Sequence, residues 1–380
     1  MRIDRRLWQA GRYFNIKKQE MMKNNRKSMS SRKWLTMLFT VKVLIFATCL
    51  VINAQAPKEK GVRLVTLENQ EKVDVYVNGT LFTSYRHPKD FEKPFLYPVF
   101  APNGSVITRG YPLDPRPGER VDHPHQVGLW FNHGNVNGLD FWNNSSAIPA
   151  AKKDTYGHIV HQKIVRAESG RKGVLEVVTH WDDNKGNTVL TANVTYIFTG
   201  DKTSRTMDHI ITLTATNGPV TITDNKEGLF AIRVDRAFEM PSKESLIFTD
   251  EKGNPTTVKA TSNEGVTGMY TSSQGLKGDA VWGTRNDWVY LSGTKDNTPI
   301  SFGIFDHPEN PGYPAYAHAR GYGLFSINNL GEKSYDPKVG EKVYNLAKGE
   351  SMRLVHRFYV QSGSELTPKK ANTIFKKFTK

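Results

Sequence analysis

The sequence predicts an all-β protein: one large antiparallel β-sandwich, followed by a short helix at the C-terminus. Three observations support this prediction. Apolar and polar side chains alternate along most of the chain after residue 60, turn-forming residues separate the alternating segments at short intervals, and only the last segment has a convincing helical pattern. The chain lacks the alternation of strands with helices that builds a parallel sheet. We therefore expect residues 57–380 to form a single β-sandwich domain.

The first predicted hairpin has the clearest pattern. Val73, Val75 and Val77 alternate with polar residues, and Asn78-Gly79 then provides a type I′ turn into a second strand at Leu81-Phe82. The same criteria predict further strands at residues 173–181, 188–198, 205–215, 220–223, 229–234, 288–291, 301–305, 324–327 and 352–360. Long irregular loops are expected at about 84–170 and 305–340. Long loops inside a compact β domain usually carry function.

The C-terminal helix is predicted from its first turn. Thr367 can cap the helix, and Pro368 occupies the first helical position, where its missing N–H costs no hydrogen bond. The helix is expected to continue over residues 369–377.

The first 56 residues are typical of an N-terminal extension with a secretory signal peptide. Basic residues precede an apolar run over 43–52, which is followed by the small-residue sequence Ala54-Gln55-Ala56. We therefore expect cleavage near Ala56, export to the periplasm or cell surface, and no stable membrane span afterwards. An uncleaved anchor is the alternative, but Lys42 interrupts the apolar segment. Cys49, the only cysteine, lies in this segment, so cleavage would leave a chain without thiol chemistry.

The positive charge of the chain is concentrated in this N-terminal segment. Residues 1–56 contain twelve Lys and Arg and only two acidic residues, so they carry +10 of the formal net charge of +15. The remaining +5 is spread along the chain without basic blocks. A nucleic-acid surface needs clustered cations that displace counterions from phosphate. We therefore expect no nucleic-acid partner.

The strongest functional signal is the segment Asp122–Trp142, which has the sequence DHPHQVGLWFNHGNVNGLDFW. It holds three of the eleven histidines of the chain, and imidazoles supply acid–base groups that titrate near neutral pH. We interpret His123, His125 and His133 as candidate catalytic residues. Amides and carboxylates suit sugar hydroxyls, and Trp rings suit the apolar faces of sugars. The predicted substrate-binding residues of this segment are Asp122, Trp130, Asn135, Asn137, Asp140 and Trp142.

Residues 306–325 contain a second group of candidates. His318 and Arg320 are two positions apart and would share one face of a strand. We interpret His318 as catalytic, and Arg320 and His307 as substrate-binding, since an arginine can hold a carboxylate or a sugar oxygen. The alternative for Arg320 is an ion pair inside the sandwich.

Glu227 is the best candidate for a carboxylate base, or for an acid with a raised pKa. It lies in the segment Asp224-Asn-Lys-Glu-Gly228, between two predicted strands. A solvated turn is the alternative. Trp282 and Trp288 add candidate aromatic lining, although core packing explains them equally well.

No cofactor is expected, and a divalent metal is the alternative. His123-Pro-His125 could place two imidazoles on one side of an extended segment, and His133 or His318 would be the third ligand. Neither an HExxH sequence nor an acidic ligand at a diagnostic spacing supports such a site.

Four blocks of the sequence resemble a bacterial family known as PmoA-like, or "methane oxygenase PmoA". These blocks are residues 97–112, 122–142, 224–234 and 306–325. One departure is Gln126, where the family pattern has a second histidine after His-Pro-His. The methane label is misleading, because a methane-oxidising membrane subunit needs several spans and this chain offers one removable apolar segment. The resemblance implies a role in bacterial sugar catabolism, and the predicted sandwich also looks like the galactose-mutarotase-type supersandwich.

These observations lead to a functional hypothesis with two alternatives. The hypothesis is an exported carbohydrate-active enzyme, a hydrolase, lyase or epimerase, which uses His and Glu for acid–base chemistry on a glycoside or modified sugar. The first alternative is a non-catalytic periplasmic glycan-binding protein. The second is a metal-dependent enzyme that uses the histidine cluster. In each case the partner is a small carbohydrate molecule.

Overall fold

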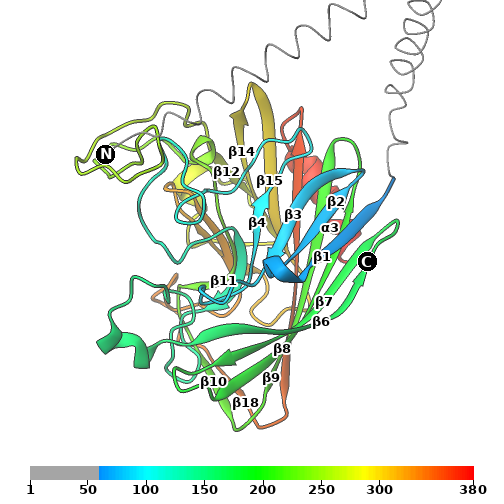
Figure 1. Ribbon diagram of the computed structural model, residues 1–380, viewed down its shortest axis with the longest axis vertical. Coiled ribbons are helices and arrows are strands. Elements are labelled where there is room, and N and C mark those ends of the chain that lie inside the picture. The colour runs from blue at the N-terminus through cyan, green and yellow to red at the C-terminus, as the bar shows by residue number, and fades with distance from the viewer. Residues whose placement is uncertain (1–59) are drawn as a thin grey trace, which may run out of the picture. The chain divides into compact units, whose positions relative to one another are not determined.

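Two large antiparallel sheets dominate the computed structural model, which describes residues 60–380 (Figure 1). The first, here called the site sheet, has the strand order β1 (Val62–Leu67), β2 (Lys72–Val77), β3 (Thr80–Arg86), β4 (Phe95–Val99), β5 (Leu129–His133), β11 (Gly228–Arg233), β17 (Leu324–Asn328), β16 (Ala315–Ala319) and β13 (Arg285–Asn286). The second, the back sheet, has the order β12 (Met269–Ser272), β14 (Trp288–Lys295), β15 (Thr298–Asp306), β19 (Ser351–Ser362), β9 (Ser204–Ala215), β8 (Thr188–Gly200), β7 (Gly173–Asp182) and β6 (His158–Glu168). The prediction of an all-β antiparallel sandwich is confirmed.

Smaller elements complete the described part of the chain. Strands β10 (Val220–Thr223) and β18 (Val343–Leu346) form a two-stranded sheet. The 3₁₀ helices are η1 (Glu68–Gln70), η2 (Ala150–Thr155), η3 (Arg236–Phe238) and η4 (Gly278–Val281), and the one α-helix among residues 60–380 is α3 (Pro368–Phe378). No helix in this part of the chain is long and apolar enough to cross a membrane. The predicted signal peptide, residues 1–56, lies outside the described residues.

Local sequence signals predicted the hairpin and the helix cap correctly. Asn78 and Gly79 have φ angles of 52° and 79°, which are the left-handed values that a type I′ turn requires. The hydroxyl of Thr367 accepts a hydrogen bond from the backbone N–H of Lys370 at 3.3 Å, so it caps α3 as expected.

The two expected long loops contain strands that the pattern did not reveal. Strands β4, β5 and β6 lie within residues 84–170, and β16 lies within 305–340. All five residues of β5 and all five of β16 are buried. A strand that is buried on both faces has no polar–apolar alternation, so period-two patterning does not detect it.

The centre of the site sheet is covered on both faces. Phe230, Ile232 and Phe325 point into the main core between the two sheets. Ala231 and Leu324 belong instead to a second apolar cluster on the other side, here called the outer face. Because side chains alternate across a strand, Arg233 shares the outer face with Ala231. The outer face of β11, β17 and β16 is where the candidate site lies.

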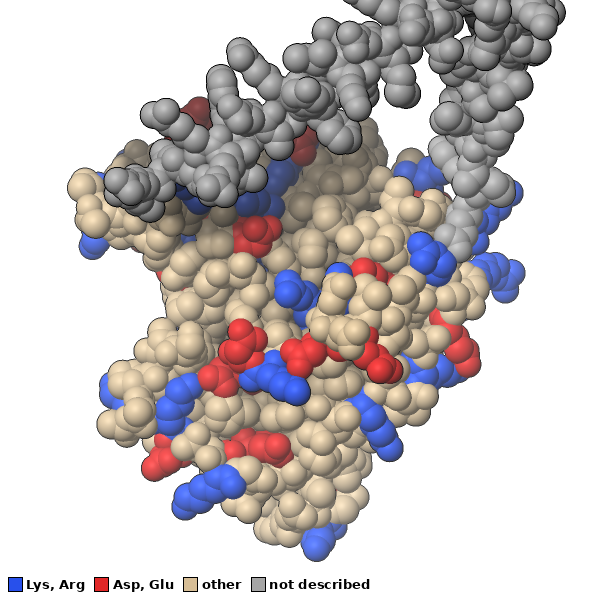
Figure 2. All heavy atoms as spheres, in the orientation of Figure 1, with Lys and Arg blue, Asp and Glu red and all other residues tan. Residues whose placement is uncertain are grey.

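Figure 2 shows Lys and Arg interspersed with Asp and Glu over the described surface that faces the viewer. This face lacks the continuous basic stripe that follows a phosphate backbone.

Several buried histidines make the fold sensitive to acid. Burial lowers the pKa of His133 to about 4 and that of His209 to about 3, and it lowers the pKa of His356 well below its usual value. Below pH 6.5 the unfolded chain therefore binds protons that the folded chain does not, so stability present above this pH is lost as the pH falls. Asp306 has the opposite effect on stability. Burial raises its pKa to about 7, so as the pH falls from 7 to 5 the folded chain takes up a proton there that the unfolded chain does not.

We expect the histidines to outweigh Asp306, so the free energy of unfolding falls between pH 7 and pH 5. Urea denaturation at the two pH values measures this change. A midpoint that is equal or higher at pH 5 would contradict the expectation.

Candidate functional site

Tyr322, in the turn between β16 and β17, is the centre of the candidate site. The His123 ring stacks on it, with the ring centroids 5.0 Å apart and the planes 2° from parallel. The guanidinium carbon of Arg233 lies 4.8 Å from the Tyr322 centroid, and that of Arg320 lies 5.8 Å from it. Segments near residues 123, 233 and 320 are thus brought together by one aromatic ring.

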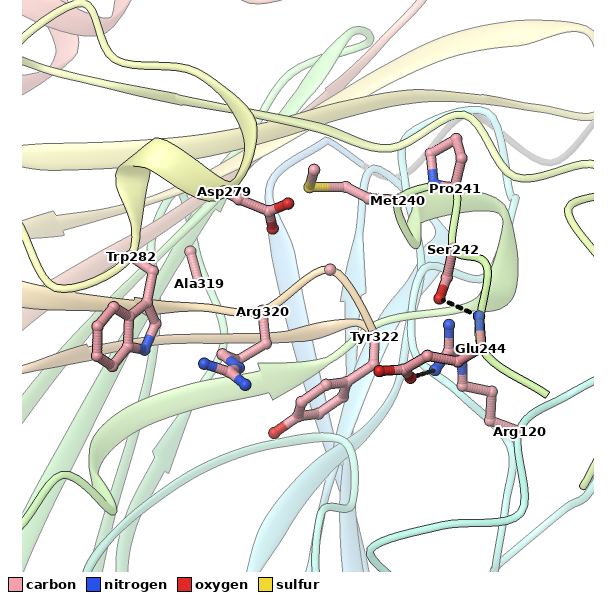
Figure 3. Close-up of a pocket in the computed structure, with 11 residues that line it drawn as sticks. Arg120, Met240, Pro241, Ser242, Glu244, Asp279, Trp282, Ala319, Arg320 and Tyr322 are labelled. Atoms are coloured by element: carbon pink, nitrogen blue, oxygen red, sulfur yellow. Dashed lines mark hydrogen bonds and ion pairs between the residues drawn. The ribbon is translucent and has the colours of Figure 1, made fainter. Parts of the chain in front are cut away.

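Arg320 has no counter-ion in the part of the chain that the structure describes. Its guanidinium lies between two aromatic rings, 5.7 Å from the centroid of Trp282 and 5.8 Å from that of Tyr322 (Figure 3). Within residues 60–380, its side chain has no hydrogen bond or ion pair. The predicted alternative, an ion pair inside the sandwich, is therefore wrong. The planar cation is positioned by stacking alone, and its N–H groups are available to a ligand.

Arg320 and Tyr322 line a cavity of about 390 Å³ (Figure 3). Its other walls come from the segment after η3, from η4 and from the β4–β5 connection, and the residues are Arg120, Met240, Pro241, Ser242, Glu244, Asp279, Trp282, Ala319 and Gly321. The volume is within the range of small-molecule sites. We call this space the Arg320 cavity.

His318 lies on the outer face of β16 and is only 3 % exposed. Its Nδ1 is buried and has no hydrogen-bond partner in the described part of the chain. Burial and, to a smaller extent, the positive charges of Arg320 and Lys226 together lower its pKa to about 3, although a hydrogen bond with the Lys226 backbone partly opposes them. His318 is therefore a neutral imidazole at physiological pH, with one free ring nitrogen.

The turn that carries Glu227 packs beside His318. The Lys226 carbonyl also accepts a hydrogen bond from the hydroxyl of Tyr335 at 2.6 Å, and Tyr335 lies edge-on to the His318 ring. The Glu227 carboxylate is 3.2 Å from Lys226 Nζ. Its charge contributes to raising the pKa values of Tyr322 and Tyr335, although burial is the larger cause for both. Glu227 is thus near both aromatic residues of the site.

A buried charge network fixes the segment that carries His123 and His125. Asp122 Oδ1 accepts hydrogen bonds from Arg109 Nη1 at 2.5 Å and from Arg233 Nη2 at 2.6 Å. Burial raises the pKa of Asp122, but Arg233, His123 and Arg109 outweigh it and hold the pKa well below its usual range. Asp122 is therefore a permanent anion that positions the segment and does not act as an acid.

Gln126 completes this network. Its Oε1 accepts a hydrogen bond from Arg233 Nη1 at 2.5 Å, its backbone carbonyl accepts one from Arg109 Nη2 at 3.1 Å, and its side chain also bonds Tyr322. Gln126 is buried, at 1 % exposure. The amide thus holds Arg233 under the Tyr322 ring, which is a positioning role that needs no proton transfer.

A family model described as a family of unknown function, DUF6807, matches residues 72–376. The chain belongs to DUF6807. No curated protein matches the sequence. The resemblance to a PmoA-like family remains a prediction.

Several solved structures resemble this DUF6807 chain weakly. The galactosidase domain of an α-galactosidase–sucrose kinase has 10 % identity and a TM-score of 0.36, with 79 % of this chain and 42 % of that chain covered. An α-galactosidase from Lactobacillus brevis has 9 % identity and a TM-score of 0.35, with 80 % and 40 % covered. A galactose mutarotase-like protein from Clostridium acetobutylicum has 12 % identity and a TM-score of 0.29, with 80 % and 99 % covered. The chain spans about two fifths of the length of the two galactosidase structures.

In this DUF6807 chain the two predicted stacking residues, Trp130 and Trp142, are core residues. They are 2 % and 0 % exposed, and their ring centroids are 5.3 Å apart in the outer apolar cluster. The prediction that they stack on a sugar is wrong. Each ring is buried by neighbouring apolar side chains, so neither presents a face to a ligand.

The polar residues of the 133–142 turn stabilise the turn and do not line the Arg320 cavity. Asn135 Oδ1 accepts from the Gly138 N–H at 3.1 Å, and Asn137 Oδ1 accepts from the Thr221 N–H at 2.7 Å. Asp140 Oδ1 accepts from the Trp142 N–H at 2.8 Å. These bonds cap local backbone groups, and the role of the three residues as sugar ligands stays a prediction.

Two predicted histidines lie away from the Tyr322 centre. The His133 Nε2 is 2.8 Å from the Thr223 carbonyl oxygen, and His133 is 1 % exposed, so it links β5 to β10. The His307 ring lies edge-on to Phe378 of α3, with the centroids 5.2 Å apart. Neither residue joins His318 and Arg320.

The described part of the chain does not bring His123, His125 and His133 together as the ligands of one metal ion. Among residues 60–380, no three His, Cys, Asp or Glu side chains are grouped so that they could hold a metal ion. His123 stacks on Tyr322 while His133 faces Thr223, which separates the members of the predicted ligand set.

Sequence patterns did not identify Arg109, Arg233 or Tyr322 as site residues, nor Lys93. Lys93 is 4 % exposed and its Nζ donates to the His125 carbonyl oxygen at 2.6 Å. Tyr322 lay inside a conspicuous block, but only the fold shows that it contacts His123, which is far away in sequence.

Proposed function

We propose that this protein is an exported carbohydrate-active enzyme that moves protons on a sugar bearing a carbonyl or carboxylate group, as a lyase or an epimerase. One observation carries the proposal. His318 is a buried neutral imidazole with a free Nδ1, and it lies near Arg320, a cation without a counter-ion, and near the Glu227 turn. His318 and Glu227 lie near Arg320 and Tyr322 but do not line the Arg320 cavity, so the reacting carbon would have to extend from the cavity toward the buried Nδ1. A base, a cation and a second titratable group are the parts that proton abstraction requires.

The chemistry follows from these three groups. His318 Nδ1 takes a proton from the carbon next to the substrate carbonyl. The electron pair of the broken C–H bond moves onto the carbonyl oxygen, where Arg320 stabilises the negative charge. Glu227 gives the second proton, either to the opposite face of that carbon or to the oxygen of a substituent that leaves the next carbon, and exchange with solvent restores both side chains. Reprotonation of the carbon on the opposite face gives epimerisation, whereas departure of a substituent from the next carbon gives elimination.

The number of carboxyl groups available for proton transfer favours a lyase or an epimerase over a hydrolase. Most glycoside hydrolases use two carboxyl groups, one of which holds its proton near neutral pH. Asp122 is fixed as an anion by Arg109 and Arg233, and Asp140 caps a turn. Of the carboxyl groups that the sequence indicated, Glu227 alone remains for proton transfer.

Two further observations support a sugar as the substrate and export as the destination. The Arg320 cavity combines the rings of Trp282 and Tyr322 with charged and hydroxyl groups, which suits a ligand with apolar faces and polar edges. Residues 1–56 have the order of a cleavable signal, which supports a periplasmic or cell-surface location.

The test is incubation of residues 57–380 with a panel of glycosides, uronate-containing oligosaccharides and 3-keto-glycosides, with products identified by mass spectrometry. We expect a product of unchanged mass in an epimerised form, or an unsaturated product formed by elimination. Incubation in deuterated water should place deuterium at the carbon that is epimerised, whereas the elimination product has lost this proton to solvent and is recognised by its unsaturation. Hydrolysis without deuterium incorporation into carbon, or no product from any substrate class, would refute the proposed chemistry.

A further inference from the structure

Lys93 is a buried amine that forms no ion pair with any residue of the described chain. It is 4 % exposed, its Nζ donates to the His125 carbonyl at 2.6 Å, and it lies 5.5 Å from the centre of the Trp130 ring. Within residues 60–380 it forms no ion pair. The neighbouring carboxylate, Glu92, is engaged elsewhere, since one oxygen is 2.8 Å from Lys153 Nζ and the other is bonded to His158.

A buried ammonium group is costly unless an anion compensates it. Proteins therefore pair buried lysines, or lower their pKa until the amine is neutral. Burial lowers the pKa of Lys93 to about 7, and the negative charges of Glu92 and Asp140 only partly offset this effect. The amine thus has no anionic partner among residues 60–380, and an anion bound beside it would supply one.

A cavity lies beside this amine. Its volume is about 480 Å³, and Lys93 and His125 line it together with Tyr111, Asn144 and Ser145. The Nε2 of His125 is buried and has no partner in the described chain. Two nitrogen-bearing side chains with unused hydrogen-bonding capacity therefore meet at one cavity. We call this space the Lys93 cavity.

The Lys93 cavity is separate from the Arg320 cavity, because the two share no lining residue. The His123-Pro-His125 segment lies between them. The His123 ring stacks on Tyr322, which lines the Arg320 cavity, while Pro124 and His125 line the Lys93 cavity.

We propose that the Lys93 cavity binds a small ligand carrying one carboxylate, which becomes the counter-ion of Lys93 and accepts a hydrogen bond from the His125 ring. A singly charged carboxylate suits the site better than a phosphate dianion. Lys93 supplies one positive charge, and Asp90 and Glu92 also border the cavity and would repel a second negative charge.

The test is calorimetric titration of the protein with acetate, D-glucuronate and D-galacturonate, with methyl α-D-glucoside as the neutral comparison. We expect at least one carboxylate to bind more tightly than the neutral sugar. Lys93→Met should weaken that binding about tenfold or more, because a charge-assisted hydrogen bond is lost. Lys89→Met is the matched control, since it removes the same charge from an exposed side chain that pairs only with Glu71 in the described chain.

Proton uptake on ligand binding is a second measurement. A lysine with a purely structural role would take up no proton when the ligand binds. At pH 8 the amine is mostly neutral, and a bound carboxylate would protonate it. Titrations in buffers of different ionisation enthalpy should therefore show uptake of nearly one proton by the wild-type protein and by Lys89→Met, and none by Lys93→Met.

Arg320→Met separates this proposal from the proposed function, because Arg320 also can hold a carboxylate. Carboxylate binding that survives Arg320→Met and is lost in Lys93→Met supports the Lys93 cavity, whatever the enzyme assays show. Binding that survives Lys93→Met, or no preference for carboxylates over the neutral sugar, would overturn the proposal. Circular dichroism of each variant confirms that the comparison is between folded proteins.

Discussion

Replacing His318 with alanine is expected to lower kcat by about 10²–10⁴-fold, the usual contribution of a positioned acid or base. His318 is buried, its Nδ1 has no partner in residues 60–380, and its pKa is lowered to about 3. The imidazole is therefore present as the base throughout the physiological range. The measurement is steady-state turnover of a substrate found in the panel, with KM expected to change much less than kcat.

The pH profile distinguishes this base from an ordinary histidine. Because its pKa is about 3, protonation of His318 should cause no loss of wild-type kcat/KM between pH 5 and 8. His307→Ala is the matched control, since that ring packs against Phe378 of α3, away from the site, and full turnover is expected. Unchanged turnover in folded His318→Ala would remove His318 from the mechanism.

Arg233→Met is expected to destabilise the fold by about 2–3 kcal/mol. Arg233 is fully buried and bonds both Asp122 and Gln126, so its loss leaves two polar groups with fewer partners. Removing one member of a buried ion pair typically costs about 3–5 kcal/mol. We expect a smaller loss of stability here, because Asp122 still has its ion pair with Arg109 and its side chain is 22 % exposed to water. Chemical denaturation measures the effect.

Arg353→Met provides the comparison for a surface arginine. Arg353 is 52 % exposed and 4.0 Å from Glu309, so its loss should change stability by less than about 0.5 kcal/mol. In the double variant Arg233→Met with Asp122→Asn, stability should fall further, because buried Arg109 also loses the carboxylate that is its one ion-pair partner in residues 60–380. Equal effects of Arg233→Met and Arg353→Met would show that the buried network does not stabilise the site.

The parts of the fold that sequence predicts are those governed by local rules. The turn at Asn78-Gly79 and the cap at Thr367 each depend on residues within a few positions, and both were predicted correctly. Strands β5 and β16 were not, because both are buried on both faces: LWFNH does not alternate, and AYAHA alternates alanine with larger ring side chains and lacks a clear apolar–polar pattern.

The chemistry of the residue types suggested the candidate residues in the sequence. The packing of the folded chain then determined which of these candidates belong to the site. His318, Glu227 and Arg320 were chosen for their chemistry, and the structure brings them near Tyr322 and His123. Trp130 and Asp140 have equally suitable chemistry, but one is core and the other caps a turn. Asp122 and Arg233 are separated by 111 positions, so no local pattern could reveal that this pair fixes the site.

The most direct test of a sugar site at Tyr322 is a crystal structure of the Glu227→Gln variant with the substrate found in the panel. This variant keeps the shape of the site and should slow turnover enough to trap the complex. The account predicts the sugar in the Arg320 cavity, with its carbonyl or carboxylate oxygen bonded to Arg320 and the carbon that loses its proton within reach of His318 Nδ1. A sugar bound elsewhere, with His318 and Arg320 both free of contact, would contradict it.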